Sequence, residues 1–518
     1  MNTRLLALCA AASLLASSCS TLPPPARIGG IQASDFEATI ARIEQNDPAS
    51  PALLNAQLAY GEYLLSAAPG PCANRIVLAQ EQLGSVAASL RTRAMFPDGW
   101  ARAADLEYRL HLARAACDSK SDRRDDFLAA IAAARRAVAL YRNEFDYRSM
   151  VIMQFDVAVA LRQAGKNAAA VAALRDALDM DRLYGFRDDA EQNYRLLLSW
   201  RGEPAGATQV AGLMADFPKR QAILKFGWHA TRARVTFESR RMTLQDGQIV
   251  RSRGAAAFER HIAAGQGGGW SISYTGRLNQ YEPGVWPSEH GSKASELKFP
   301  PAAFPAAGFN VSGKGEFESV TDSKAFATRL IARADERIKA GAPSGKDAAD
   351  LTADAVATAD FALSPGLLEA GTAENYQLET AMWIGARLEQ GVWYEMSAPL
   401  SLPGMPEFVV QQRIEFAFTR MVPCTTGASS QTCVELVIHA TPDKDALQDV
   451  LTDLAGTEED PYFHYDASTA ARIVVDPATL LPYARDEKTF WYASVGTGTG
   501  QSLLSSEHRV STTTYRAR

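Results

Sequence analysis

The hydrophobic residues of the chain follow two different periods, and the change between them falls near residue 220. From about Ser34 to Phe217, apolar residues recur at three- and four-residue spacing, and Ala, Leu and Arg are abundant. This period and these strong helix formers together predict α-helices. From about Gln221 onward, several segments instead alternate apolar and polar residues, which predicts antiparallel strands with one buried face.

Turn signals separate the predicted strands in the second half. The alternating segments are 235–237, 270–274, 414–418, 434–438 and 510–515, and Gly- or Pro-containing turns such as Pro403-Gly404 lie between them. Helices are expected at 323–339, 346–363 and 445–454. Because helices and strands are segregated along the chain, the predicted class is α+β, a helical domain followed by an antiparallel β-rich domain with a few helices.

Segment 155–181 is predicted to form two helices joined by a turn at Gly165. Gly165, Ala170, Leu174 and Ala177 have the spacing of a tetratricopeptide (TPR) repeat, and a similar pattern recurs near Ala130 and Ala207. The helical half therefore resembles TPR proteins, which implies stacked helix pairs with a concave surface that binds proteins or peptides. Gln154 and Arg182 replace the aromatic residue and the Pro of the TPR pattern, so a plain helical bundle is the alternative.

Aromatic and basic side chains in the helical half are candidates for that concave surface, with ordinary helix packing as the alternative: Tyr141, Arg142, Tyr147, Arg148 and Tyr184.

The segment 471–494 is the most distinctive local pattern of the second half. A strand ends at Asp476-Pro477, and a turn then leads into a second strand at 488–494. This arrangement resembles exported β-sheet proteins of the half-barrel, lipoprotein-carrier kind. The resemblance implies a curved antiparallel sheet that holds an apolar ligand on its concave side. The alternative is that the aromatic residues simply build a core: Trp393, Phe416, Phe418, Phe490 and Trp491.

The N-terminus has the pattern of an export signal. Arg4 precedes an apolar stretch from Leu5 to Leu15, which is shorter than the roughly 20 residues that span a bilayer. The run from Leu15 to Cys19 resembles a bacterial lipobox, which implies removal of residues 1–18 and a lipid on Cys19. Ala16, not Leu, stands three residues before Cys19, so ordinary cleavage to a soluble periplasmic protein is the alternative.

The residues after Cys19 fit a lipid-anchored domain. A polar, Pro-rich linker covers residues 19–33, and Ser20 resembles outer-membrane sorting because it is not the Asp associated with inner-membrane retention. No later stretch is apolar for about 18 residues, so no other segment is predicted to span a bilayer. We expect the protein at the periplasmic face of the outer membrane, with domains at 34–218 and 219–518 and a further subdivision near 320–365 as an alternative.

The chain has six Cys, which divide by position. Cys9 leaves with the signal and Cys19 takes the lipid, and the four that remain allow three pairings. Sequence proximity and the domain division favour Cys72 with Cys117 and Cys424 with Cys433, the second pair closing the tip of a hairpin. Export favours disulfides over free thiols, and the spacing does not fit a zinc site.

Composition and charge exclude several classes of protein. The 518 residues are 47% hydrophobic and 22% charged, as in folded globular proteins, and the length suggests two to four domains. A formal net charge of -6 argues against a nucleic-acid partner, which usually requires a basic surface.

Candidate chemistry is sparse. The chain lacks a nucleophile elbow, a P-loop, a dinucleotide fingerprint and an HExxH helix, so no catalytic residue, metal site or cofactor is predicted. One cluster could hold a ligand or a hard cation, or do acid/base work, although it lacks EF-hand spacing and a solvated loop is the alternative: Glu458, Glu459, Asp460, His464 and Asp466.

These observations favour a non-enzymatic, outer-membrane-anchored periplasmic lipoprotein that acts as a protein-binding or envelope-assembly scaffold. One alternative is a periplasmic carrier that binds lipid or another apolar ligand on a curved β-sheet. A second alternative is a cell-envelope hydrolase with a site near the domain boundary.

Substitution of Cys19 by Ala tests the predicted anchor. We expect radioactive palmitate to label the wild type and not Cys19→Ala, because the thiol is the predicted site of lipid attachment. Equal labelling of both proteins would contradict the lipoprotein assignment.

Overall fold

The computed structural model describes residues 32–46, 50–93, 99–117, 123–204, 206–215, 217, 220–245, 248–275, 281–284, 307–340, 365–402, 405–425, 431–443, 446–447, 462–497 and 500–517. The chain forms two compact units. The first, called the helical unit below, comprises 1–218 with 459–464 and 494–502, and the second, the sheet unit, comprises 219–458, 465–493 and 503–518. The predicted α+β class is confirmed.

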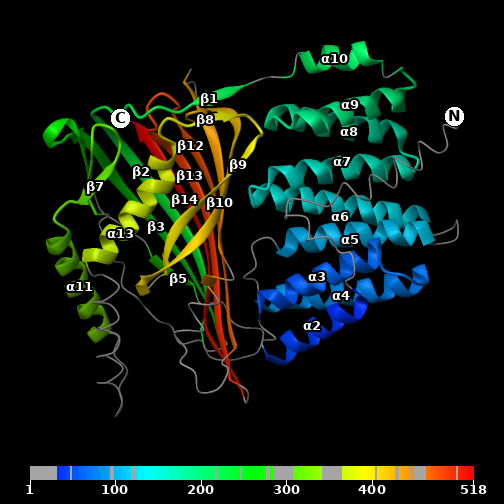
Figure 1. The fold of residues 1–518 in the computed structure, drawn as a ribbon, viewed down its shortest axis with the longest axis horizontal. Coiled ribbons are helices and arrows are strands. Elements are labelled where there is room, and N and C mark those ends of the chain that lie inside the picture. The colour runs from blue at the N-terminus through cyan, green and yellow to red at the C-terminus, as the bar shows by residue number, and fades with distance from the viewer. Residues whose placement is uncertain are drawn as a thin grey trace. The chain divides into compact units, whose positions relative to one another are not determined.

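The helical unit is a stack of antiparallel helices in which each described helix packs against the next one in the chain (Figure 1). The helices are α2 (Ala33–Asn46), α3 (Pro51–Ser66), α4 (Cys72–Arg93), α5 (Gly99–Cys117), α6 (Arg123–Asn143), α7 (Tyr147–Gln163), α8 (Asn167–Tyr184), α9 (Arg187–Arg201) and α10 (Ala207–Ala215). Helix α3 also packs against α5, which follows it by two positions.

The predicted helix pair at 155–181 is confirmed as part of α7 and α8. Gly165 lies in the turn between them at φ 74°, a left-handed conformation that glycine adopts without strain. Ala170, Leu174 and Ala177 are fully buried on one face of α8, as the small-residue spacing predicted. The alanines let the neighbouring helices approach closely, while Leu174 fills the space between them.

The candidates for a concave surface separate into two groups. Tyr141, Tyr147 and Tyr184 are buried, and the rings of Tyr147 and Tyr184 stack with their centroids 4.5 Å apart. Arg142 and Arg148 are exposed. The three tyrosines therefore serve helix packing, which was the alternative for these residues.

The sheet unit contains one large antiparallel sheet. Its strands follow the order β7-β6-β4-β3-β2-β14-β13-β12-β11-β10-β9, and β5 pairs with β3. The strands are β2 (Thr231–Gln245), β3 (Gln248–Ala264), β4 (Trp270–Thr275), β5 (Tyr281–Gly284), β6 (Phe309–Val311), β7 (Phe317–Val320), β9 (Trp393–Leu402), β10 (Met405–Pro423), β11 (Thr432–Pro442), β12 (Tyr462–Val475), β13 (Pro482–Thr497) and β14 (Gly500–Ala517).

The sheet consists of two runs of strands, β2 to β7 and β9 to β14. The two runs are joined where β14, near the C-terminus, pairs with β2. In that pair Tyr515 lies opposite Val235 and Arg509 lies opposite Arg241. A separate two-stranded sheet joins β1 (Gln221–Ile223) to β8 (Arg387–Glu389). The remaining described elements are α11 (Ser323–Ala340), α13 (Pro365–Glu379) and the 3₁₀ turns η1 (Gln266–Gly268) and η2 (Ala381–Trp383).

The predicted strands are confirmed within β2, β4, β10, β11, β12, β13 and β14, and the helix expected at 323–339 is α11. The expected helix at 346–363 lies outside the described residues, as does all of 445–454 except Ala446 and Leu447. The Asp476-Pro477 turn joins β12 to β13 as expected. The Asp476 carboxylate accepts hydrogen bonds from the Ala478 amide and the Thr479 hydroxyl, both at 2.9 Å, which holds the turn.

Both predicted disulfides are present. Cys72 at the start of α4 is bonded to Cys117 at the end of α5, with a Cα–Cα distance of 6.2 Å. Cys424, directly after β10, is bonded to Cys433 on β11, with a Cα–Cα distance of 4.9 Å, and closes the hairpin tip. Each unit therefore carries one covalent link between consecutive elements.

The large sheet has two chemically different faces. The inner face, defined by Ile414, Ile438 and Ile473 on β10–β12 and by Ile262 and Ile272 on β3 and β4, carries the two main apolar clusters of the unit. Helix α13 lies against this face, as Figure 1 shows, and its Tyr376 packs in the cluster of Ile262 and Ile272. The short β1–β8 sheet and Trp383 of η2 cover the cluster of Ile414 and Ile438.

The opposite, charged face carries ion pairs between neighbouring strands. Arg413 on β10 lies 2.8 Å from the Glu395 carboxylate on β9, and Glu435 on β11 accepts from Arg420 and Arg472 at 3.0 and 2.8 Å. Burial alone would raise the pKa of Glu435, but the two guanidinium groups outweigh it and lower the pKa. The period-two alternation of β10–β12 thus produces one apolar and one charged surface.

A single carboxyl group breaks the apolar pattern of α8. Asp181 follows Ala170, Leu174 and Ala177 on the buried face and is itself 0% exposed. Its Oδ2 accepts a 2.6 Å hydrogen bond from Asn193 on α9, while its Oδ1 has no hydrogen-bond partner among the described residues. Burial raises the pKa of Asp181 to about 8, with Asn193 opposing the shift and Asp189 adding to it.

This raised pKa predicts that the helical unit loses stability as the pH rises. Between the unfolded pKa of about 3.9 and the folded value of about 8, only the native state keeps the proton, so the free energy of unfolding falls by up to about 1.4 kcal/mol per pH unit. We expect Asp181→Asn to reduce this slope by up to about 1.4 kcal/mol per pH unit between pH 5 and 8, in urea unfolding followed by circular dichroism at 222 nm, while Asp156, whose pKa is raised to about 7, keeps a slope of the same sign below pH 7. Asp179→Asn, at an exposed position of the same helix, should keep the wild-type slope.

Candidate functional site

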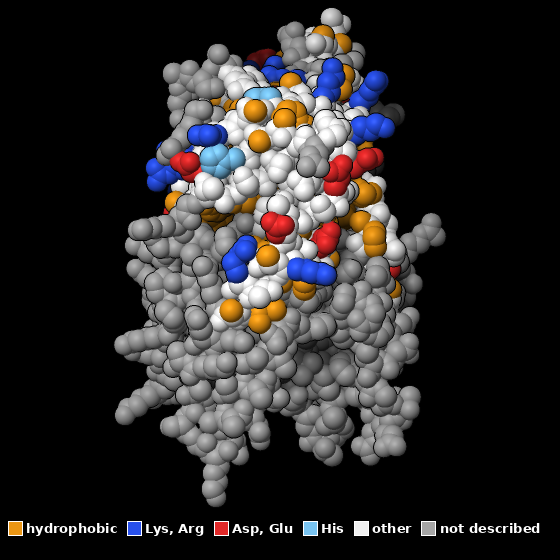
Figure 2. Space-filling view, turned by 90° about the vertical axis from the view of Figure 1, so that its left-hand side faces the viewer, with side chains coloured by type: hydrophobic (Ala, Val, Ile, Leu, Met, Phe, Trp, Pro, Cys, Tyr) orange, Lys and Arg blue, Asp and Glu red, His pale blue; other side chains and the backbone are white. Residues whose placement is uncertain are grey.

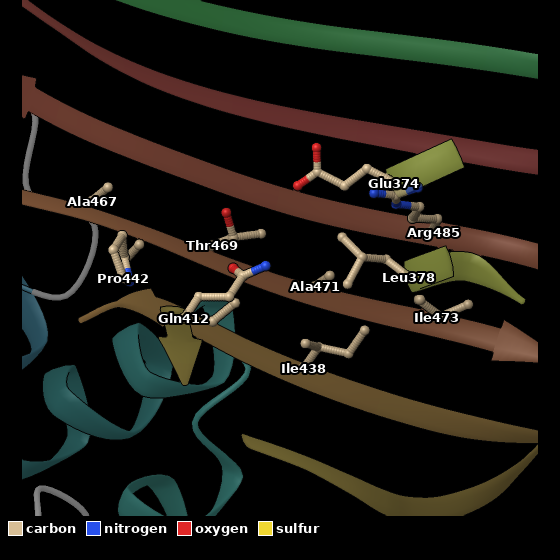
Figure 3. Close-up of a pocket in the computed structure, with 12 residues that line it drawn as sticks. Glu374, Leu378, Gln412, Ile438, Pro442, Ala467, Thr469, Ala471, Ile473 and Arg485 are labelled. Carbon is tan, nitrogen blue, oxygen red and sulfur yellow. The ribbon is translucent and has the colours of Figure 1, made fainter. Parts of the chain in front are cut away.

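A cavity of about 80 Å³ lies between α13 and strands β10–β13 on the inner face (Figure 3). Most of its surface is apolar, from Leu378, Ile438, Ala440, Pro442, Ala467, Ala471 and Ile473. The polar residues of the lining are Glu374, Gln412, Ser468, Thr469 and Arg485. Pro442 and Ala467 lie at one end, and Glu374 and Arg485 lie at the other.

Strand register explains why these residues meet. Ile438 lies opposite Ala471, and Ala440 lies opposite Thr469, in the antiparallel pair β11–β12. Gln412 of β10 lies opposite Pro442 of β11 in the next pair. The small side chains of Ala440, Ala467 and Ala471 leave room below α13 where larger residues elsewhere fill the same face. Glu374 and Leu378 are four residues apart and therefore share one face of α13.

The polar end of the cavity contains a buried guanidinium group. Arg485 on β13 is 8% exposed, and its Nη2 lies 2.5 Å from the Glu487 carboxylate. Its Nη1 lies 3.9 Å from Oε2 of Glu379, and its Nε has no hydrogen-bond partner among the described residues. Burial alone would lower the pKa of Arg485, but Glu487 and Glu379 outweigh burial and raise the pKa, so the side chain carries its charge inside the protein.

A second buried arginine, Arg260, lies near the same carboxylate, that of Glu379. Arg260 on β3 is 6% exposed, and its Nη1 lies 4.0 Å from Oε1 of Glu379. The Arg260 guanidinium also lies over the Tyr515 ring, 4.4 Å from its centroid, and the Tyr515 hydroxyl donates to Glu379 at 2.8 Å. Burial, with Glu379 next, raises the pKa of Tyr515 well above its usual value, so this hydroxyl keeps its proton and remains a donor.

This arrangement suits binding better than catalysis. The floor of the cavity offers apolar contact over β11 and β12, and the buried Arg485 offers a hydrogen-bond donor at one end. Ligand sites commonly combine a mostly apolar wall with a few polar groups that fix orientation. A ligand with an apolar body and one hydrogen-bond acceptor matches both features.

The predicted acidic cluster stays untested. Glu458, Glu459 and Asp460 lie outside the described residues, as does the predicted lipidation site Cys19. His464 and Asp466 lie on β12, not on a loop, and Asp466 is half-buried. Within the described part of the chain, no group of three or more His, Cys, Asp or Glu side chains could hold a metal ion.

The charged residues beside the cavity, and the tyrosine bonded to them, were missed by the sequence analysis. Arg260, Glu379, Arg485 and Tyr515 come from β3, α13, β13 and β14, so no local motif contains two of them. One pattern in the sequence did indicate that Arg485 points inward. Arg485 lies an even number of residues from the buried Leu481 on the same segment, and residues at even spacing share one face of a strand. However, Asp486 and Lys488 alternate with Arg485 and Glu487, so both faces of β13 carry charges. The alternation therefore did not show which face of β13 is the inner one.

Comparisons with protein-family models and with curated proteins give no match to this chain. In the described residues, every helix is too short or too polar to cross a bilayer.

Substitution of Glu379 by Gln tests the role of the shared carboxylate. Gln can still accept from Tyr515, but Arg260 and Arg485 lose a common counter-charge in a buried setting. We expect the free energy of unfolding to fall by about 3 kcal/mol, at the low end for a broken buried pair because both Nη–Oε distances are near 4 Å. Urea unfolding followed by tryptophan fluorescence measures this loss. Glu369→Gln on the same helix should stay within about 0.5 kcal/mol of wild type, and equal losses in both variants would contradict the assignment.

Proposed function

We propose that the sheet unit binds and carries an apolar ligand of the acyl-chain kind on its inner face, below α13. The cavity between α13 and β10–β13 carries this proposal, because its lining is mostly apolar and continuous with the cluster of Ile438, Ala471 and Ile473. The carrier role was an alternative in the sequence analysis.

The size of the cavity requires that α13 moves when a ligand binds. About 80 Å³ is well below the several hundred Å³ of a typical ligand pocket. Tyr376 is the one residue of α13 that is buried, among those whose side chains the structure describes. The other described side chains of the helix are half-buried or exposed, and the helix also packs against α11 and β7.

The C-terminal end of α13 is fixed more firmly than its start. The Tyr376 hydroxyl donates to the Gly315 carbonyl at 2.8 Å, and the indole of Trp383 in η2 donates to the Leu378 carbonyl at 2.9 Å. Trp383 is itself fully buried in the cluster below. Movement of the helix around Glu374, which is exposed, would widen the cavity at that end.

Protein binding by the helical unit is a second candidate function, as the TPR resemblance implies. The stacked helices support it, and polar contacts join helices two positions apart: Arg102 on α5 donates to Asn55 on α3 at 2.5 Å, and Tyr108 on α5 bonds to Asp156 on α7. Burial and the neighbouring Asp105 raise the pKa of Asp156 to about 7, against the opposing charge of Arg109. With a lipid on Cys19, both units would act at the periplasmic face of the outer membrane.

Figure 2 shows one face of the molecule, on which basic, acidic and apolar side chains of the described residues are interspersed.

Binding of an uncharged apolar probe tests the carrier function. We expect 1-N-phenylnaphthylamine fluorescence to rise in the presence of the full-length protein, and Ala467→Trp to weaken binding at least tenfold by filling the cavity. Ala467 is half-buried, so the larger side chain can be accommodated without overpacking the core.

The matched control is Ala470→Trp, because Ala470 is also half-buried on β12 but points to the charged face, opposite His439. This variant should bind the probe as the wild type does. Absence of binding to the wild type, or equal binding by both variants, would refute the proposed function.

A further inference from the structure

We infer that the ligand of this site ends in a carboxylate, and that Arg485 recognises it, so that the sheet unit takes a free fatty acid rather than an uncharged or phosphate-bearing lipid. This inference rests on the proposed function, since it assigns the chemical class of the ligand in the same cavity. It adds the orientation of the ligand, with the carboxylate at Arg485 and the acyl chain along the apolar lining.

Arg485 meets the two conditions for recognising an acceptor inside the protein. It lines the cavity, and it is more than nine-tenths buried. Its Nε–H has no hydrogen-bond partner among the described residues, although a buried donor strongly favours an acceptor. Arg260 also has an unpartnered Nε, but it does not line the cavity, so of these two arginines only Arg485 is placed to meet a ligand there.

The surrounding charges allow a carboxylate to approach. Glu487 lies between two arginines, with Oε2 at 2.5 Å from Arg485 and Oε1 at 3.7 Å from Arg509 on β14. When a ligand carboxylate bonds to Arg485, Glu487 can keep Arg509 as its partner. Glu379 lies 3.9 Å from Nη1 of Arg485, beyond hydrogen-bond distance, and it keeps Arg260 and the Tyr515 hydroxyl.

The same charges disfavour a phosphate. Glu379 and Glu487 both lie within 4 Å of the Arg485 guanidinium, and Glu374 stands at the exposed rim of the cavity. A dianionic phosphate would face these three carboxylates with one unpartnered donor, whereas a single negative charge suits the position better. An uncharged ester or alcohol would gain the apolar contacts but would lack the stronger charge-assisted hydrogen bond.

The apolar lining sets the direction of the chain. From Arg485 the cavity passes Leu378 and Ala471 toward Ala467 and Pro442 at the opposite end. A carboxylate at Arg485 therefore places the acyl chain over β11 and β12, running from Leu378 of α13 toward Ala467 and Pro442.

Competition against 1-N-phenylnaphthylamine at pH 8 tests this inference on the wild-type, full-length protein. The competitors share one chain length: dodecanoic acid, methyl dodecanoate and dodecyl phosphate. We expect dodecanoate to bind at least tenfold more tightly than either of the others. Equal affinity for acid and ester, or preference for the phosphate, would overturn the carboxylate inference while leaving the carrier function in place.

Failure of all three compounds and of the probe to bind would instead overturn the carrier function itself. The variant Arg485→Lys keeps the positive charge but loses the Nε donor and the planar fork of arginine. It should retain binding of the probe and of the ester and lose the preference for the acid. Arg472→Lys, on the charged face of β12, should keep the wild-type preference; loss of preference in both variants would contradict a specific role for Arg485.

Discussion

The carboxylate of Glu379 is the contact on which the arrangement of the sheet unit's inner face depends. Two buried guanidinium groups, Arg260 on β3 and Arg485 on β13, lie within 4.0 Å of its oxygens, and Tyr515 on β14 donates to it. Buried charges are tolerated only when they are paired, so the strands that bring these arginines inward also require a carboxylate above them. Glu379 is the last residue of α13, and this requirement fixes where the helix ends on the sheet.

The position of α13 in turn divides the inner face into two apolar clusters with a polar strip between them. Tyr376 packs with Ile262 and Ile272 on one side, whereas Leu378 packs toward Ile438 and Ile473 on the other. Where β11 and β12 present alanines instead of larger residues, the helix does not reach the sheet and a cavity remains. The cavity and the buried charges thus have a common origin in the placement of one helix.

Sequence periodicity predicted most of the secondary structure but not this placement. The three- and four-residue spacing located α7 and α8, and the period-two alternation located the paired segments of β10 and β11, because each pattern records which side of a single element is buried. The disulfide at the β10–β11 tip was predictable for the same reason, since both Cys flank one hairpin. Local patterns of this kind describe an element and its immediate neighbour.

The candidate site depends instead on pairing between distant segments. Arg260 and Tyr515 come together because β14 returns to pair with β2, which lies beside β3. Nothing in the residues near 260 indicates a partner some 250 positions later, and a charged residue on a strand is ordinarily assigned to the solvent side. Tyr141, Tyr147 and Tyr184 illustrate the same limit, since their burial depends on which helices pack over them.

The ion pairs of Glu379 with Arg260 and Arg485 lie at the C-terminal end of α13. A ligand can therefore enter the cavity without breaking them. Glu379 lies next to Thr380 and η2, where Trp383 is fully buried, so the ion pairs belong to the part of the helix that stays in place. The rim of the cavity at Glu374 is more than one helical turn away, toward the end with few buried side chains. Movement of the helix around Glu374 would widen the cavity over β11 and β12 without separating Glu379 from its arginines. The energetic cost of opening is then mainly lost apolar contact, which an acyl chain replaces when it binds.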